Sequence, residues 1–250
     1  MLKTIQIICF FCIIPFYSQL KLVVKELDYE QNKSIMPQGL NTLGIEKEYK
    51  GHILELTVIN ESDNSITFPL DTLSYALPFT EDLNAYYQEQ NLILAPDMVN
   101  SLAVYGFIYQ KGKFFEGALG DEPSYDYPGI MDRNNFREKR EKVINEWGLR
   151  NNIKDDVMRA YNWYLMKNLI TIKPGKKIKY KIYFNPFFKM LNRYGEQEFY
   201  YQLNFKLPYK VNFKIICNEN LYKLLTTRQR KEYKNLFIGV VESNTLDLSN

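Results

Sequence analysis

Apolar and polar side chains alternate with a period of two along several stretches of the chain, which is the pattern of β-strands with one buried face. The alternation is most regular in segment 51–72, whose two halves are separated by the polar cluster 60–64. Asparagine, serine and aspartate side chains in such a cluster hydrogen-bond their own backbone and favour chain reversal. Its apolar positions are Leu54, Leu56 and Val58, then Ile66, Phe68 and Leu70. The segment is therefore predicted to form a β-hairpin or a corner between two sheets.

The same period predicts further strands, at 20–28, 45–50, 73–79, 101–109, 177–184, 199–207, 211–217 and 236–241. The strongest two are 177–184 and 199–207, which we expect to be adjacent antiparallel strands around loop 185–197. Their apolar sets then face the core. The tail 242–250 is polar and is expected to fray.

The period changes to that of a helix between the two groups of strands. Phe136, Val143 and Trp147 fall on one helical face with Ile144 at its flank, and Gly148 is expected to end this helix. A second helix is predicted from 153 to 167, with an inner face made of Ile153, Val157, Ala160, Tyr161 and Tyr164. The two helices form an expected insertion at about 133–168 that covers one edge or end of a sheet.

A short helix is predicted near the C-terminus, because Thr226 and Gln229 have capping-box spacing for a helix through Lys234. The elements together predict a mainly β fold, an antiparallel β-sandwich in a single domain at 20–250. The chain has 20 tyrosines and 16 phenylalanines, and such flat side chains suit the gap between two packed sheets.

Two short motifs resemble corners of known β-sandwiches. Ile172-Lys173-Pro174-Gly175 before a strand resembles the apolar residue and Pro-Gly found in immunoglobulin-like and fibronectin type III-like folds. Ile178 stands where the fibronectin-type tyrosine would be, and Tyr180 follows two residues later. Segment 58–63 is similar to the opening of exported bacterial immunoglobulin-like modules, including a group similar to proteinase-inhibitor domains. The resemblance implies an immunoglobulin-like sandwich, and it leaves function open because such folds host adhesion, carbohydrate binding and inhibition.

The N-terminus has the layout of a secretory signal peptide over 1–19. Lys3 precedes an apolar run at 5–17 that is too short to span a bilayer. Export to the periplasm, cell surface or medium is therefore predicted, with no stable membrane insertion after signal removal. An uncleaved anchor is the alternative, because cleavage after Ser18 places Phe16 where a small residue is preferred.

Cysteine usage and charge exclude several classes of protein. Cys9 and Cys12 lie in the apolar run as filler, which leaves Cys217 alone in the mature chain and allows no internal disulfide. Cys217 continues an alternating apolar face and is expected to be buried and inert. Lys and Arg number 32 against 29 Asp and Glu, so no global field favours nucleic acid as a partner.

Most common catalytic residue sets are missing. His52 is the single histidine and is expected to be a half-exposed residue at a strand end. One histidine and one buried cysteine do not make a zinc site, and no Gly-x-Ser-x-Gly or phosphate-binding glycine motif occurs. The sequence therefore predicts no metal and no cofactor.

Carboxylate chemistry stays open in the segment 110–135, which is expected to be one long ordered loop. It combines acids with aromatics, namely Asp121, Glu122, Asp126 and Asp132 with Phe114, Phe115, Tyr125 and Tyr127. Two such acids across a cleft suffice for a glycosidase, and the same acids are potential calcium ligands. The alternative is that they are solvated loop charges with aromatics packed beneath.

Two surfaces are candidates for binding. The outer face of the predicted strand pair would present Lys177, Lys179, Lys181, Tyr183, Tyr200, Gln202, Asn204 and Lys206. Cations, amides and rings side by side suit an acidic glycan or an acidic loop of a partner, although exposed lysines also keep sheets soluble. Trp163 lies about 120° from the face of Val157, Tyr161 and Tyr164 by helical spacing, which predicts exposure.

The leading hypothesis is an exported, non-catalytic β-sandwich module that contacts an envelope protein or glycan. The first alternative is a carboxylate-dependent hydrolase that uses segment 110–135. The second is an inhibitor-like module that presents a rigid loop, with 185–197 as the candidate.

Overall fold

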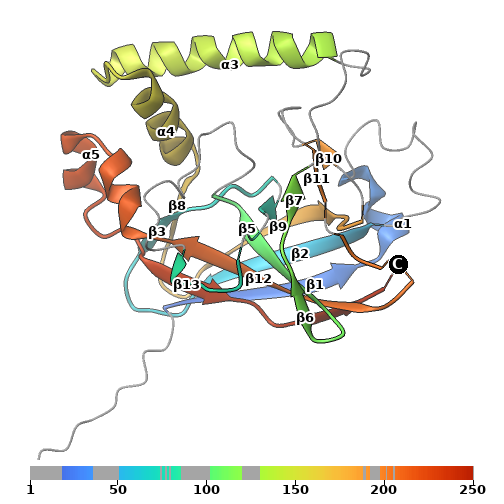
Figure 1. Cartoon of the computed structure of the whole chain (residues 1–250). Coiled ribbons are helices and arrows are strands. Elements are labelled where there is room, and N and C mark those ends of the chain that lie inside the picture. The colour runs from blue at the N-terminus through green and yellow to red at the C-terminus, as the bar shows by residue number, and fades with distance from the viewer. Residues whose placement is uncertain are drawn as a thin grey trace, which may run out of the picture.

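The fold is mainly β, with several antiparallel sheets and a pair of helices on one side (Figure 1). The computed structural model describes residues 19–35, 51–73, 75, 76, 78, 80–85, 102–119, 130–187, 190, 191, 198–200, 202–204 and 206–249. Of 118, 119, 130–137, 190, 191 and 198–200 it describes the backbone alone. The predicted signal peptide up to residue 18 and the predicted strand at 45–50 lie outside these residues.

A three-stranded antiparallel sheet contains β1 (Leu20–Leu27), β2 (His52–Asn60) and β9 (Lys177–Phe184), in the order β1-β2-β9. Side chains alternate across it as the sequence predicts, with Leu20, Leu22 and Val24 of β1 and Leu54, Leu56 and Val58 of β2 all buried. The partner of β9 is β2, so the predicted pairing of 177–184 with 199–207 is wrong. In the described part of the second segment, Phe199 and Tyr200 belong to a strand, β11 (Glu198–Tyr200), which pairs with β10 (Met190–Leu191) and β7 (Ala118–Leu119).

The larger sheet is built on β12 (Tyr209–Cys217) and β5 (Val104–Gln110), which are antiparallel neighbours. Around them lie β13 (Gly239–Glu242), β14 (Leu246–Leu248) and β6 (Lys113–Phe115), while β4 (Tyr75–Ala76) pairs with β5 in parallel. The tail predicted to fray therefore contains a strand, β14. It is held further by Asn244, whose side chain accepts from the Val24 amide and donates to the Val24 carbonyl, both at 2.9 Å.

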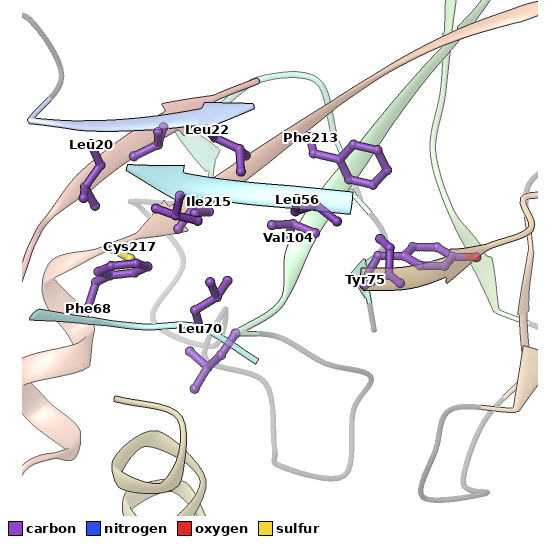
Figure 2. Packing of buried hydrophobic residues seen from close by; sticks show 14 of the residues in the cluster. Leu20, Leu22, Leu56, Phe68, Leu70, Tyr75, Val104, Phe213, Ile215 and Cys217 are labelled. Atoms are coloured by element: carbon purple, nitrogen blue, oxygen red, sulfur yellow. The ribbon is translucent and has the colours of Figure 1, made fainter. Parts of the chain in front are cut away.

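The buried faces of these sheets meet in one hydrophobic core (Figure 2). The core brings leucines of β1 and β2 together with Phe213 and Ile215 of β12 and Val104 of β5. Phe68 and Leu70 enter it from β3 (Ile66–Pro69) and the residue after it. The rings of Tyr75, Phe184 and Phe213 pack edge to face, with centroids 4.8 and 5.3 Å apart. Cys217 is fully buried here, as predicted.

The polar cluster after β2 makes a corner between sheets and not a β2–β3 hairpin. β3 pairs with β8 (Leu169–Ile172), and β2 pairs with β1 and β9. Asn60 is fully buried at this corner, where its Nδ2 donates to the carbonyls of Asn64 at 2.7 Å and Ile172 at 2.9 Å. Its backbone carbonyl accepts from the amide of Gly175, which has a φ of +64° that favours glycine. One asparagine thus ties both chain reversals together.

Helices α3 (Ile130–Arg150) and α4 (Asp156–Lys167) form the predicted insertion between β7 and β8. Gly148 does not end the first helix, which continues to Arg150. Val143 and Val157, placed on inner faces by the sequence pattern, are 44% and 60% exposed. The predicted capping box is present at α5 (Thr227–Glu232), which follows the 3-10 helix η4 (Glu219–Leu224).

Two other predicted segments differ. In the described part of the strand expected at 73–79, Tyr75–Ala76 forms β4, and the expected loop 110–135 contains β6, β7 and the start of α3. A short helix α1 (Tyr29–Asn32) and the 3-10 turn η1 (Lys33–Ile35) follow β1. Among the described residues, no helix is long and apolar enough to cross a lipid bilayer.

Candidate functional site

Five lysines gather on the outer side of the three-stranded sheet, and we call this surface the lysine face. Its members come from the two outer strands and are all exposed: Lys21 and Lys25 of β1, and Lys177, Lys179 and Lys181 of β9. The register explains the gathering, because Lys21 and Lys177 both oppose Ile59, while Lys25 and Lys181 both oppose Glu55. Side chains at alternate positions share one face of a sheet.

Glu55 is the acid at the centre of this surface. Its Oε1 lies 3.0 Å from Lys179 Nζ and 3.3 Å from Lys25 Nζ, so it links the two outer strands across β2. The hydrogen bond from Lys179 lowers the pKa of Glu55 below its ordinary value, with help from Lys25. Only 14% of the Glu55 side chain is exposed, while about half of each lysine is exposed.

The positive charges of the remaining three lysines are less fully neutralised by nearby acids. Lys21 lies 3.6 Å from Glu61, and Lys181 donates to the Asn32 side chain at 2.8 Å. Lys177 forms no ion pair with the described residues. Among the described residues, the five lysines are paired with two glutamates, so this group carries a net positive charge although the whole chain is nearly neutral.

Tyr183 does not belong to this surface, contrary to the sequence prediction. It occupies a lysine-side position of β9 but is buried, because η1 packs against β9 and Gly51 lies directly against its ring. A Cβ at Gly51 would stand 2.4 Å from the Tyr183 ring. The Tyr183 hydroxyl accepts a hydrogen bond from Asn185 Nδ2 at 3.1 Å. Burial of this tyrosine sets one end of the lysine face.

The other residues of the predicted strand-pair surface lie elsewhere. Tyr200 is on β11, which pairs with β7, and its side chain lies outside the description. Gln202, Asn204 and Lys206 are exposed but are not in a strand beside β9. The structure therefore keeps three of the predicted lysines together and adds Lys21 and Lys25. Their alternation is visible in the sequence, but only the pairing through β2 places them with β9.

Trp163 is buried, contrary to its predicted exposure. It is 8% exposed, and Lys167 Nζ lies 4.8 Å from its ring centroid. The predicted exposure is wrong because α4 packs on both α3 and η4, so more of its circumference is buried than a single apolar stripe indicates. Tyr164, on the predicted inner face, is buried and donates to Asp71 at 3.0 Å.

His52 is buried, not half exposed. It is 6% exposed, and its Nδ1 lies 2.6 Å from Glu26 Oε1 on the neighbouring strand. The rings of His52 and Tyr209 form a T-shaped pair, with centroids 6.1 Å apart. No hydroxyl or thiol of the described residues is hydrogen-bonded to Nε2. The carboxylate and imidazole therefore form a structural pair at the end of the core without an attached nucleophile.

Most of the acids proposed for catalysis or calcium binding are not among the described residues. This applies to Asp121, Glu122 and Asp126, and to the neighbouring Tyr125 and Tyr127. For Asp132 only the backbone is described. Phe114 packs near the rings of Phe107 and Tyr109. Within the described residues, no group of three or more His, Cys, Asp or Glu side chains is placed to hold a metal ion.

The chain was compared with known proteins in three ways. It matches no protein-family model, no curated protein and no solved structure.

Proposed function

We propose that the chain is an exported, non-catalytic module with an immunoglobulin-like sandwich fold, and that its lysine face contacts an acidic protein or glycan of the cell envelope. The observation that carries this proposal is the convergence of lysines from β1 and β9 around a single central acid, Glu55. The shared core and the corner at Asn60 support the sandwich.

The spacing of the lysines suits an extended polyanion. Alternate residues of a strand are about 7 Å apart, and β1 lies two strands from β9, at roughly 10 Å. Cations on such a flat grid can pair with successive anionic groups of a polysaccharide or an acidic peptide. Long-range attraction between the two surfaces would speed association and weaken with added salt.

The proposal is tested by direct binding of two defined polyanions, heparin as a sulfated glycan and poly-L-glutamate as an acidic polypeptide. Replacement of Lys177, Lys179 and Lys181 by alanine should weaken binding about tenfold or more, because three of the five cations are removed. The matched control replaces Lys139, Lys142 and Lys154, which are exposed on and beside α3. Both triple variants have the same net charge.

Unchanged binding in the β9 variant, or equal losses in both variants, would refute the lysine face as the contact surface. A preference for heparin over poly-L-glutamate would assign the partner to glycans, and the reverse would assign it to proteins. Thermal unfolding of each variant checks that the fold is intact.

Export rests on the N-terminal apolar run. Its test is fractionation of cells that express the full chain, followed by mass measurement of the exported product. Removal of about the first 19 residues is expected. Full-length chain retained with the membrane would support the uncleaved-anchor alternative.

A further inference from the structure

A pocket of about 550 Å³ opens beside the larger sheet. It lies where the turn between β5 and β6, the loop that enters β12, and β14 come together. Tyr109, Leu207, Pro208 and Tyr209 contribute to its walls. The volume is within the range of small-molecule sites, which combine apolar walls with a few polar groups. The lysine face belongs to the other sheet, so this pocket is a separate feature.

The wall formed by Leu207 and Pro208 is fixed by a buried glutamine at the end of β5. Gln110 Nε2 donates to the carbonyls of Asn204 at 2.9 Å and Leu207 at 3.1 Å. Gln110 Oε1 accepts from the Asn204 amide at 3.1 Å. These three bonds hold the loop against β5, and proline restricts the backbone at the next position. Because this wall is already ordered, it loses little conformational entropy when a ligand binds, and this favours binding.

The opposite rim is a tight turn with an open mouth. Lys111 and Gly112 have φ of 52° and 75°, which fits a two-residue hairpin turn between β5 and β6. A Cβ built on Gly112 would meet nothing within 4 Å. The absence of a side chain at Gly112 leaves this part of the rim open.

The charges at the pocket leave one cation available. Lys210 is engaged with Asp247, whose Oδ1 lies 3.5 Å from its Nζ. Lys111 is exposed and forms no ion pair with the described residues. Tyr109 stays protonated, because burial and a hydrogen bond with Glu81 raise its pKa to about 12. The pocket thus offers aromatic and aliphatic walls, with an ammonium group at the rim that has no ion pair among the described residues.

We propose that this pocket binds a small organic anion with a flat apolar body, of the aryl carboxylate or aryl sulfonate class. The body lies between the ring of Tyr109 and the wall of Leu207 and Pro208, and the anionic group pairs with Lys111. A cationic ligand is disfavoured, because Asp247 already has Lys210 as its partner.

The test uses two fluorescent probes with the same pair of rings and different charge. 8-Anilinonaphthalene-1-sulfonate is an anion, and N-phenyl-1-naphthylamine is its neutral counterpart. On the full chain, the sulfonate should show a saturable fluorescence increase. Lys111→Glu should weaken the sulfonate about tenfold or more through charge reversal, while the affinity for the neutral probe changes less than about twofold.

Two further variants separate the pocket from general effects. Lys113→Glu makes the same charge change on the same hairpin, outside the pocket lining, and should leave both probes bound as before. Leu207→Trp should fill the pocket and weaken both probes. Thermal unfolding of each variant reports whether the fold is retained.

The proposal is overturned if Lys111→Glu and Lys113→Glu weaken the sulfonate equally. It is also overturned if the sulfonate shows no saturable binding, or if a folded Leu207→Trp variant binds both probes as the wild type does. Because Lys111→Glu lies in an exposed turn, its result stands even where Leu207→Trp fails to fold.

Discussion

Asn162 and Gln229 form a reciprocal side-chain amide pair in the interior of the helical region. Asn162 Nδ2 donates to Gln229 Oε1 at 2.6 Å, and Gln229 Nε2 donates back to Asn162 Oδ1 at 3.2 Å. Asn162 also donates to the Leu224 carbonyl at 2.7 Å and accepts from Trp147 Nε1 at 2.9 Å. One fully buried residue of α4 therefore connects α3, η4 and α5.

Asn162→Asp should destabilise the protein by about 3–5 kcal/mol at pH 7, because it places an uncompensated charge among buried carbonyl oxygens. The carboxylate cannot donate to Leu224 or Gln229. Burial raises the pKa of such an aspartate, so the deficit should shrink as the pH falls and the acid becomes neutral. Urea unfolding at pH 7 and pH 5 measures both effects.

The control for this variant is Asn145→Asp on the exposed side of α3. Asn145 accepts one bond from Arg159 at 2.9 Å and is solvent-exposed. Its substitution should change the free energy of unfolding by less than about 0.5 kcal/mol. Equal effects at the two positions would contradict the structural role assigned to Asn162.

Asn60→Ala tests the corner between the sheets. The substitution removes the Asn60 donor from the carbonyl of Ile172 and leaves the Ser62 amide without its acceptor at 2.9 Å, while the Asn64 carbonyl keeps the Ser62 hydroxyl as a donor. A loss of about 2–3 kcal/mol is expected, since buried polar groups lose their partners. Asn64→Ala is the control, because only the backbone of Asn64 takes part in these bonds. Denaturant unfolding that shows no difference between the two variants would refute the role of the Asn60 side chain.

Which residues lie in strands was largely predictable, because burial of one sheet face forces the alternation seen in β1, β2, β9 and β12. The pairing of strands was not predictable, because alternation indicates which side chains of a strand are buried but does not indicate which other strand pairs with it. For that reason the sequence alone did not place Lys25 and Lys181 on either side of Glu55.

The local sequence pattern also could not predict which side chains are buried by segments distant in the sequence. Tyr183 continues the lysine side of β9, yet η1 and Gly51 bury it. Trp163 was expected to be exposed on the assumption that α4 packs along a single stripe, whereas α4 contacts both α3 and η4. The capping box of Thr226 and Gln229 was predictable because it depends on residues three positions apart.

Glu55→Gln should affect stability and polyanion binding in opposite directions. The folded protein lowers the pKa of Glu55, so its contribution to stability is complete above the ordinary value of 4.5 and is lost as the pH falls through the folded pKa. At pH 7 the variant should be less stable by about 0.5–1 kcal/mol, because the pairs are partly exposed. The difference in free energy of unfolding should stay constant from pH 8 to about pH 5.5 and shrink at lower pH.

Loss of this acid should meanwhile strengthen heparin binding roughly two- to fivefold, because Lys25 and Lys179 lose their partner. Isothermal titration at fixed salt measures the change. Glu61→Gln, at the margin beside Lys21, should produce a smaller increase. A weaker affinity in the Glu55 variant would contradict direct contact between the polyanion and this face.

Cys217 should resist alkylation in the folded protein. It is 1% exposed at the end of β12, and burial raises the pKa of its thiol to about 12. At pH 8 this pKa makes the reactive thiolate about three orders of magnitude rarer than in an unfolded chain. Peptide mapping after iodoacetamide treatment distinguishes Cys217 from Cys9 and Cys12, and alkylation of Cys217 should become complete in guanidinium. Equal rates of Cys217 alkylation with and without denaturant would show that the thiol is accessible, which would contradict the burial of Cys217 in the same core cluster as Phe68.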